Sequence, residues 1–258
     1  MPEGQYGVLK RNALKSYLDW GGFPEIVLAD DAMRPLILEE YASLMLYRDV
    51  VERYGVRNEK LMRELLRHCF RHTASLLNVS KLHRDFRSLG FTASKNTLFR
   101  YLQYLEDAFL VFFLPKLERS LRKQAHNPKK LHVIDPGLVS GFKATPGQDA
   151  GHRLETAVFL ETRRRRKDLF YYADGAETDL CDGGGTMFIN TCWSIGDGPT
   201  LLREEEAMSF GFQRWPGAEG RLLYHEWSPE TARHIQGAKP AWHYLAGMND
   251  GKNPVTAD

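Results

Sequence analysis

The chain has 258 residues, of which 43% are hydrophobic and 26% charged, as in ordinary globular proteins. This composition excludes disordered, collagen-like and low-complexity chains, and the longest apolar run, Ala108 to Leu114, is shorter than the roughly 18 residues that cross a bilayer. The net charge of +2 conceals a basic segment, residues 81–130, which holds 11 basic and 4 acidic side chains. Such an excess is typical of a surface that binds a polyanion, and equally of an ordinary solvated surface.

The cysteines and the amino terminus indicate the compartment. Cys69, Cys181 and Cys192 are odd in number and not closely paired, so they predict neither a disulfide framework nor a four-cysteine zinc site. The first residues lack the basic-then-apolar order of a signal peptide. We therefore expect a cytoplasmic protein without a membrane partner.

Residues 1–64 are expected to form a helical segment. Apolar residues between Leu36 and Val51 recur at mostly helical spacing, which is the pattern of an amphipathic helix. The sequence Gly-Gly-Phe-Pro at residues 21–24 ends the preceding helix, because glycine and internal proline both disfavour a continuing helix.

Residues 65–144 are predicted to form a winged-helix domain. Ser80 is expected to cap one helix, and Gly90 to end it in a left-handed conformation. Ser94 is expected to cap the next helix, over residues 95–109. Two helices joined by a short glycine-containing turn form a helix-turn-helix.

The second of these helices is the candidate recognition helix. Such a helix lies in the major groove of DNA and presents its amino-terminal and outward side chains to the bases. Lys95, Asn96 and Arg100 occupy those positions and are the expected groove contacts.

A wing is expected after this helix. Two apolar, β-rich segments, residues 110–114 and 130–134, are joined by a basic connection. Lys129 and Lys130 are the expected phosphate contacts. The alternative is that the winged helix serves only for packing or for docking on another protein.

Residues 145–246 are predicted to form a second domain, after the turn-forming stretch that ends at Asp149. The predicted order is α-β-β-β-α-β, followed by a flexible tail over residues 247–258. The elements are a helix from about His152 into the basic run 163–167, strands at 169–172, 177–181 and 187–193, a helix at 199–212 and a strand at 221–225.

This order could carry a magnesium-dependent phosphodiesterase site, in which carboxylates bind the metal and a lysine stabilises charge. Glu155 on the helix and Asp179 on the middle strand are the candidate metal ligands. Where an acid-x-lysine pair is expected on the third strand, the sequence has Asn190 and Cys192. An amide is a weaker ligand and a thiol cannot replace an ammonium group, so we expect a degenerate, inactive site.

The hairpin turn decides whether these residues meet. Asp179 faces Asn190 if the turn has four residues, 183–186, because residues paired across a hairpin have numbers of constant sum. A turn of odd length would place Asp179 beside Ile189 instead.

An ordered set of short landmarks resembles a known family: Gly21-Gly-Phe-Pro-Glu25, Tyr47-Arg-Asp49, Glu52-Arg53, Asp135-Pro-Gly137, Leu154-Glu155, Glu177-Thr-Asp179 and Arg203-Glu204. They are similar to the carboxyl-terminal part of prokaryotic AAA-type ATPases that bear a domain of unknown function. The resemblance implies a winged helix followed by a PD-(D/E)XK nuclease-like domain. It also implies an amino-terminal ATPase module, which we expect to be missing here, so that residues 1–64 would be the helical segment that follows it.

The expected fold is therefore α+β, with a helical amino-terminal region and winged helix-turn-helix followed by a restriction-endonuclease-like domain. The leading hypothesis is a non-catalytic, DNA-binding region whose partner is duplex DNA. The alternatives are a weak metal-dependent nuclease and a module that docks on an ATPase partner, which exposed apolar residues around Trp20 and Phe23 would favour. No cofactor is expected, and Mg²⁺ only if the nuclease-like site is active.

Overall fold

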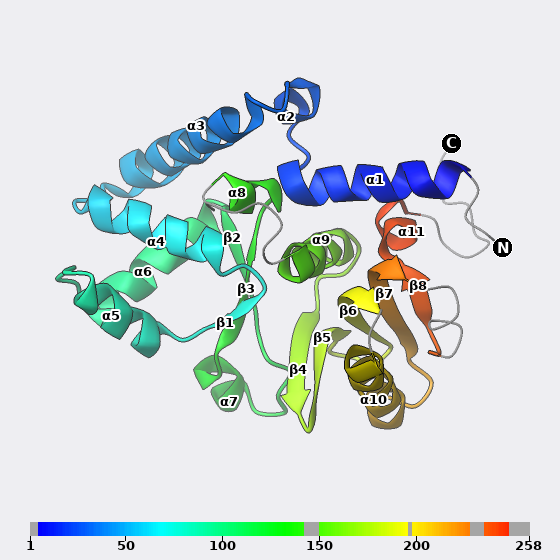
Figure 1. The fold of residues 1–258 in the computed structure, drawn as a ribbon. Coiled ribbons are helices and arrows are strands. Elements are labelled where there is room, and N and C mark those ends of the chain that lie inside the picture. Colours follow the sequence, from blue (N-terminus) through cyan, green and yellow to red (C-terminus); the bar gives the residue numbers. More distant parts are fainter. Residues whose placement is uncertain (1–4, 142–149, 196–197, 228–234, 248–258) are drawn as a thin grey trace, which may run out of the picture. The chain divides into compact units, whose positions relative to one another are not determined.

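The computed structural model describes residues 5–141, 150–195, 198–227 and 235–247 (Figure 1). The fold is α+β, as predicted. The contacts divide the chain into two compact units: a helical unit, residues 17–115 and 120–148, and a sheet unit, residues 1–16, 116–119 and 149–258. Within the described ranges, no helix is both long and apolar enough to cross a membrane.

The helical unit contains most of the helices and a small sheet. Helix α1 (Gln5–Trp20) contributes its last residues to this unit. The other elements are α2 (Pro24–Leu28), α3 (Arg34–Leu46), the π-helix η1 (Tyr47–Glu52), α4 (Glu59–Arg71), β1 (Ser75–Leu77), α5 (Val79–Ser88), α6 (Lys95–Asp107), β2 (Val111–Leu114), α7 (Leu121–His126), β3 (Lys129–Val133) and α8 (Gly137–Ser140).

Side-chain caps fix the ends of α5 and α6. The hydroxyl of Ser94 accepts a hydrogen bond from the Thr97 amide at 3.0 Å, which confirms the predicted cap of α6. The predicted cap of α5 was wrong: Asn78, not Ser80, accepts from the amides of the first turn. Gly90 follows α5 with φ of +85°, the left-handed conformation predicted for it.

The small sheet is antiparallel, with β3 between β1 and β2. Lys130 therefore lies in the central strand and pairs with Leu76 on one side and Leu114 on the other. The connection from β2 to β3 contains a short helix, α7, which the sequence pattern did not predict.

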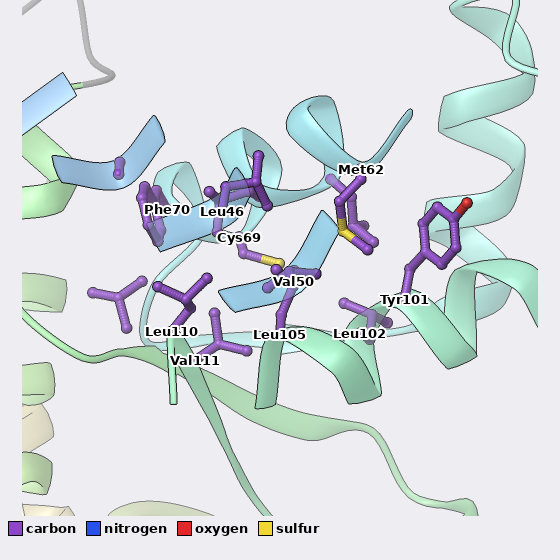
Figure 2. Close-up of a cluster of buried hydrophobic side chains, with 14 of the residues drawn as sticks. Leu46, Val50, Met62, Cys69, Phe70, Tyr101, Leu102, Leu105, Leu110 and Val111 are labelled. Atoms are coloured by element: carbon purple, nitrogen blue, oxygen red, sulfur yellow. The ribbon is translucent and has the colours of Figure 1, made fainter. Parts of the chain in front are cut away.

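One hydrophobic core joins the helices of this unit to its sheet (Figure 2). Helix α4 contributes Met62, Cys69 and Phe70, and α6 contributes Leu102 and Leu105. Burial of apolar side chains contributes roughly 25 cal/mol per Å² removed from water, so this shared core fixes α6 against α4 and leaves its other face exposed.

The sheet unit has a five-stranded mixed sheet in the order β4-β5-β6-β7-β8. The first three strands are antiparallel, and β7 and β8 each run parallel to the preceding strand. The elements are α9 (Ala150–Arg165), β4 (Leu169–Asp174), β5 (Ala176–Asp182), β6 (Met187–Ile195), α10 (Gly198–Arg214), β7 (Glu219–Trp227), β8 (Ala238–Pro240) and α11 (Ala241–Leu245). The order from α9 to β7 is the predicted one.

Asp182 fixes the hairpin between β5 and β6. Its carboxylate accepts from the amides of Thr186 (2.7 Å) and Met187 (3.1 Å) and from Arg166 (2.8 Å). Burial raises the pKa of Asp182, but the hydrogen bond from the Thr186 hydroxyl, together with these donors, outweighs burial and holds the pKa below its ordinary value. The result is a four-residue turn.

The predicted segment boundaries are not those of the compact units. Residues 17–64 share their core with residues 65–144, because α3 and η1 pack in the same cluster as α4 and α6. The predicted boundary near residue 145 lies outside the described residues, and so does the predicted tail over residues 247–258 except for Gly247.

Candidate functional site

The hairpin brings together three of the four predicted site residues. The register pairs Leu180 with Ile189 and Cys181 with Phe188, which is the constant-sum register expected of a four-residue turn. Continued by one residue beyond these pairs, it places Asp179 opposite Asn190. Side chains two positions apart on a strand share a face. Asp179, Asn190 and Cys192 thus lie on the sheet face that carries Cys181 and Phe188, which pack in a cluster with Met208 of α10.

Asp179 is held by the neighbouring strand. One carboxylate oxygen, Oδ2, accepts from the Thr191 amide at 2.8 Å and from the Thr191 hydroxyl at 2.9 Å. The side chain of Asn190 donates through Nδ2 to the Glu177 carbonyl at 3.3 Å, and its Oδ1 is buried without a donor among the described residues. Asp179 therefore has a fixed orientation, next to an amide oxygen able to accept from a bound water or to coordinate a cation.

Helix α10 adds an arginine and a buried glutamate to this site. Arg203 donates two hydrogen bonds to Oε1 of Glu204, from Nε at 3.1 Å and from Nη2 at 2.7 Å. The Glu204 bond is the main reason why the pKa of Arg203 is raised, and Asp179 adds to it. Burial is the main reason why the pKa of Glu204 is raised; Arg203 opposes this shift, and Asp179 adds to it.

The sequence pattern assigns no chemical role to Arg203 and Glu204. They stood out only as a landmark of the resemblance, because the positive charge was expected on the third strand rather than on the next helix. The structure brings an arginine to the neighbourhood of Asp179 and Cys192 from α10.

Cys192 is a neutral thiol in this setting. Burial raises its pKa to about 11, with a further contribution from Glu204. Its Sγ donates to the Ser194 carbonyl at 3.2 Å. A thiol with this pKa is neither an effective nucleophile near neutral pH nor a substitute for a positive charge.

Glu155, the fourth predicted site residue, lies on α9 and is 9% exposed. Helix α9 packs against β6. Among the residues that the structure describes, no three His, Cys, Asp or Glu side chains gather closely enough to hold a metal ion. Glu155 and Asp179 are therefore not members of a three-ligand cluster in this structure.

The predicted groove contacts lie on one exposed surface of α6. Lys95, Asn96 and Arg100 are exposed, whereas Leu98 and Leu102 are buried in the core. The end of the Lys95 side chain is held by a hydrogen bond, in which Nζ donates to the Ser80 hydroxyl at 3.2 Å.

The two predicted phosphate contacts differ in exposure. Lys129, at the start of β3, is exposed. Lys130 is only 3% exposed, so its predicted phosphate contact is wrong for this structure. The two lysines are neighbours on β3, so their side chains leave opposite faces of the sheet, and only the face of Lys130 is covered at this point.

The exposed apolar residues expected at Trp20 and Phe23 are found instead at later positions in the sequence. Trp20 and Phe23 are partly buried against the core of the helical unit. Val27 and Leu28 on α2 and Leu36 on α3 are exposed, at 59%, 88% and 59%.

Fold and site together define an α+β protein with an exposed basic surface on α6 in one unit and, in the other, a group of Asp179, Arg203 and Glu204 that we call the acid–arginine site. The chain belongs to the family described as "Domain of unknown function (DUF8612)", whose model matches residues 11–148. Its relatives include an uncharacterized protein, MJ1544, of Methanocaldococcus jannaschii, 33% identical over 207 residues (75% of this chain and 45% of the relative). Another is an uncharacterized protein of Haemophilus influenzae, 28% identical over 149 residues (58% and 37%).

This chain therefore spans less than half the length of either relative. No solved structure shows a significant match to it.

Proposed function

We propose that this chain binds duplex DNA through a winged helix in its helical unit, and that its sheet unit is a non-catalytic, nuclease-like scaffold. The order α4-β1-α5-α6-β2-β3, with β3 between the other two strands, supports a winged helix. The short strand β1, absent from the sequence prediction, completes that order.

The exposed surface of α6 carries this proposal. Lys95, Asn96 and Arg100 project from the amino-terminal half of the second helix of a helix-turn-helix, and the opposite face of that helix is buried. Arginine and asparagine make bidentate contacts with bases, and lysine contacts phosphates. Lys129 adds a cation at the start of β3.

The order α9-β4-β5-β6-α10-β7 supports a nuclease-like scaffold, as does the resemblance to the carboxyl-terminal region of AAA-type ATPases. The third strand carries Asn190 and Cys192 where a working site has an acid and a lysine. The guanidinium of Arg203 is already hydrogen-bonded to the buried carboxylate of Glu204. This pairing favours a structural role for the site.

A salt titration tests DNA binding. Fluorescence anisotropy with a short, labelled blunt duplex is expected to show binding at about 50 mM salt that weakens as salt rises, because bound phosphates release counterions. Lys95→Ala/Lys129→Ala should reduce the slope of log K against log salt by about 2, since each phosphate contact contributes about 0.9. The charge-matched control is Arg163→Ala/Arg164→Ala on α9, which should leave the slope unchanged. Absence of binding at low salt would overturn the proposal.

A second candidate is a weak metal-dependent nuclease, favoured by the proximity of Arg203 to Asp179. Asp179 and the Asn190 amide oxygen fit as oxygen donors to a divalent ion, which would supply Lewis-acid polarisation of a phosphate. Incubation of supercoiled plasmid with Mg²⁺ or Mn²⁺ distinguishes the two candidates. Nicking that is lost in Asp179→Ala and in Arg203→Ala would establish the nuclease; no nicking supports the scaffold.

Docking on a protein partner is the remaining alternative. The exposed Val27, Leu28 and Leu36 support it, since monomeric proteins rarely expose neighbouring apolar side chains over a large area. An ATPase subunit is the partner that the resemblance implies.

A further inference from the structure

A groove with a volume of about 580 Å³ lies beside the proposed recognition helix. Its walls come from α6, from the start of α5 and from the residues that lead into β3. Phe99 is 62% exposed and lines the groove together with Leu102 and Phe113. The volume is in the range of small-molecule sites, and Phe99 offers an aromatic surface to whatever enters.

The charged groups of this groove are of two kinds. Lys129 lines it, and Lys95 lies at its edge, because the Ser80 hydroxyl that accepts from Lys95 also lines the groove. Glu106 and Asp107, near the end of α6, supply carboxylates to the same groove. Cations, an aromatic ring and carboxylates therefore line a single groove.

We infer that this groove receives one unpaired nucleotide of a DNA strand, so that the chain prefers duplexes with a single-stranded end over blunt ones. A nucleotide has an anionic phosphate for Lys95 and Lys129, a flat base for Phe99, and N–H donors on its base for Glu106 or Asp107. Stacking of a base on an aromatic side chain is a common basis of single-strand binding. This inference rests on the proposed binding of duplex DNA.

The carboxylates determine how the nucleotide is oriented in the groove and which base is preferred. They repel a phosphate, so the phosphate goes to the lysines and the base to Glu106 and Asp107. Guanine presents two adjacent N–H donors, from N1 and N2, which match the two oxygens of a carboxylate. Thymine presents one N–H between two carbonyl acceptors, so a guanine end is expected to bind more tightly than a thymine end.

The test compares one duplex in three forms: blunt, with a short guanine overhang, and with a thymine overhang of the same length. Overhangs at both 5′ and 3′ ends are included. In fluorescence anisotropy, the guanine overhang is expected to improve the affinity of the wild-type chain by about tenfold over the blunt duplex. The thymine overhang should give a smaller gain.

Substitutions in the groove identify the contacts. Phe99→Ala should abolish the gain from the overhang while blunt-duplex affinity stays within about twofold, and Phe99→Trp should retain the gain, because it keeps a stacking surface. Glu106→Gln/Asp107→Asn should reduce the preference for guanine over thymine. The matched control is Phe109→Ala: Phe109 is 61% exposed but does not line the groove.

The outcomes separate the two proposals. Blunt-duplex binding without any gain from the overhang overturns the nucleotide site and leaves the winged helix intact. A gain that persists in Phe99→Ala also overturns it, because the unpaired nucleotide then binds outside the groove. Failure to bind any duplex form overturns the proposed function itself.

Discussion

The carboxylate of Asp135 accepts a hydrogen bond from the backbone amide of Gly22, 113 residues earlier in the chain, at 2.8 Å. The other oxygen of Asp135 accepts from the Gly137 amide, also at 2.8 Å. Two of the short landmarks, Gly-Gly-Phe-Pro and Asp-Pro-Gly, thus meet through one buried side chain. Asp135 is 8% exposed, and it joins the end of α1 to the start of α8.

Replacement of Gly21 tests how tightly this junction is packed. Gly21 has φ of +81°, and a Cβ built on it would lie 1.8 Å from Oδ1 of Asp135. Gly90 has a similar φ of +85° but open space around its Cβ position, so Gly90→Ala is the matched control. We expect Gly90→Ala to cost about 1 kcal/mol in free energy of unfolding, from backbone strain alone, and Gly21→Ala to cost at least about 2 kcal/mol more. Equal losses in urea denaturation would contradict this packing.

The Asp135 carboxylate is itself expected to stabilise the helical unit. Asp135→Asn replaces one acceptor by an NH₂ donor, so either the Gly22 or the Gly137 amide loses its partner. The expected loss is about 1–3 kcal/mol at neutral pH, since an unsatisfied buried donor is costly. Asp30→Asn, at an exposed position of the same unit, should change stability by less than about 0.5 kcal/mol.

Acid is expected to destabilise the chain through His68. Burial, followed by the neighbouring His72, lowers the pKa of His68 to about 4 from an ordinary 6.5. The unfolded chain therefore binds more protons between these values, so the free energy of unfolding falls as pH decreases from 6.5 to about 4. Because solvent reaches part of the ring, the expected loss is about 1–2 kcal/mol.

His68→Leu should remove this part of the pH dependence, and His126→Gln, an exposed histidine on α7, should retain it. The measurement is urea denaturation at several pH values in that interval. An unchanged slope in His68→Leu would show that His68 is not the group responsible.

The Arg203–Glu204 pair is expected to hold the acid–arginine site together. Arg203→Ala leaves the Glu204 side chain, which is 6% exposed, without its two donors, and should cost about 1–3 kcal/mol. Arg164→Ala is the control: Arg164 is equally exposed, at 72% against 70%, but its partner Glu161 retains Arg165. Adding Glu204→Gln to Arg203→Ala should recover part of the loss; no recovery in thermal or urea unfolding would argue against a charge effect.

Local patterns in the sequence predicted the order of most elements. Hydrophobic period, turn glycines and the Ser94 cap act within a few residues, so α6, α9 and the β5–β6 hairpin were found close to their observed limits. The four-residue turn also fixed the hairpin register, because Asp182 binds the amides that close it. Three-residue strands such as β1 and β8 are too short to show a period, and they were missed.

The sequence by itself determined that this is an α+β chain with a basic segment over residues 81–130 and a third strand of the second unit that has Cys192 where a lysine is expected. Only the tertiary structure decided which cations are exposed: the side chain of Lys130 is buried, whereas those of Lys95 and Lys129 are exposed. It also brought Arg203 to Asp179 and Asp135 to Gly22. These pairings depend on how helices pack on sheets across many intervening residues, and the spacing of residues along one segment does not encode them.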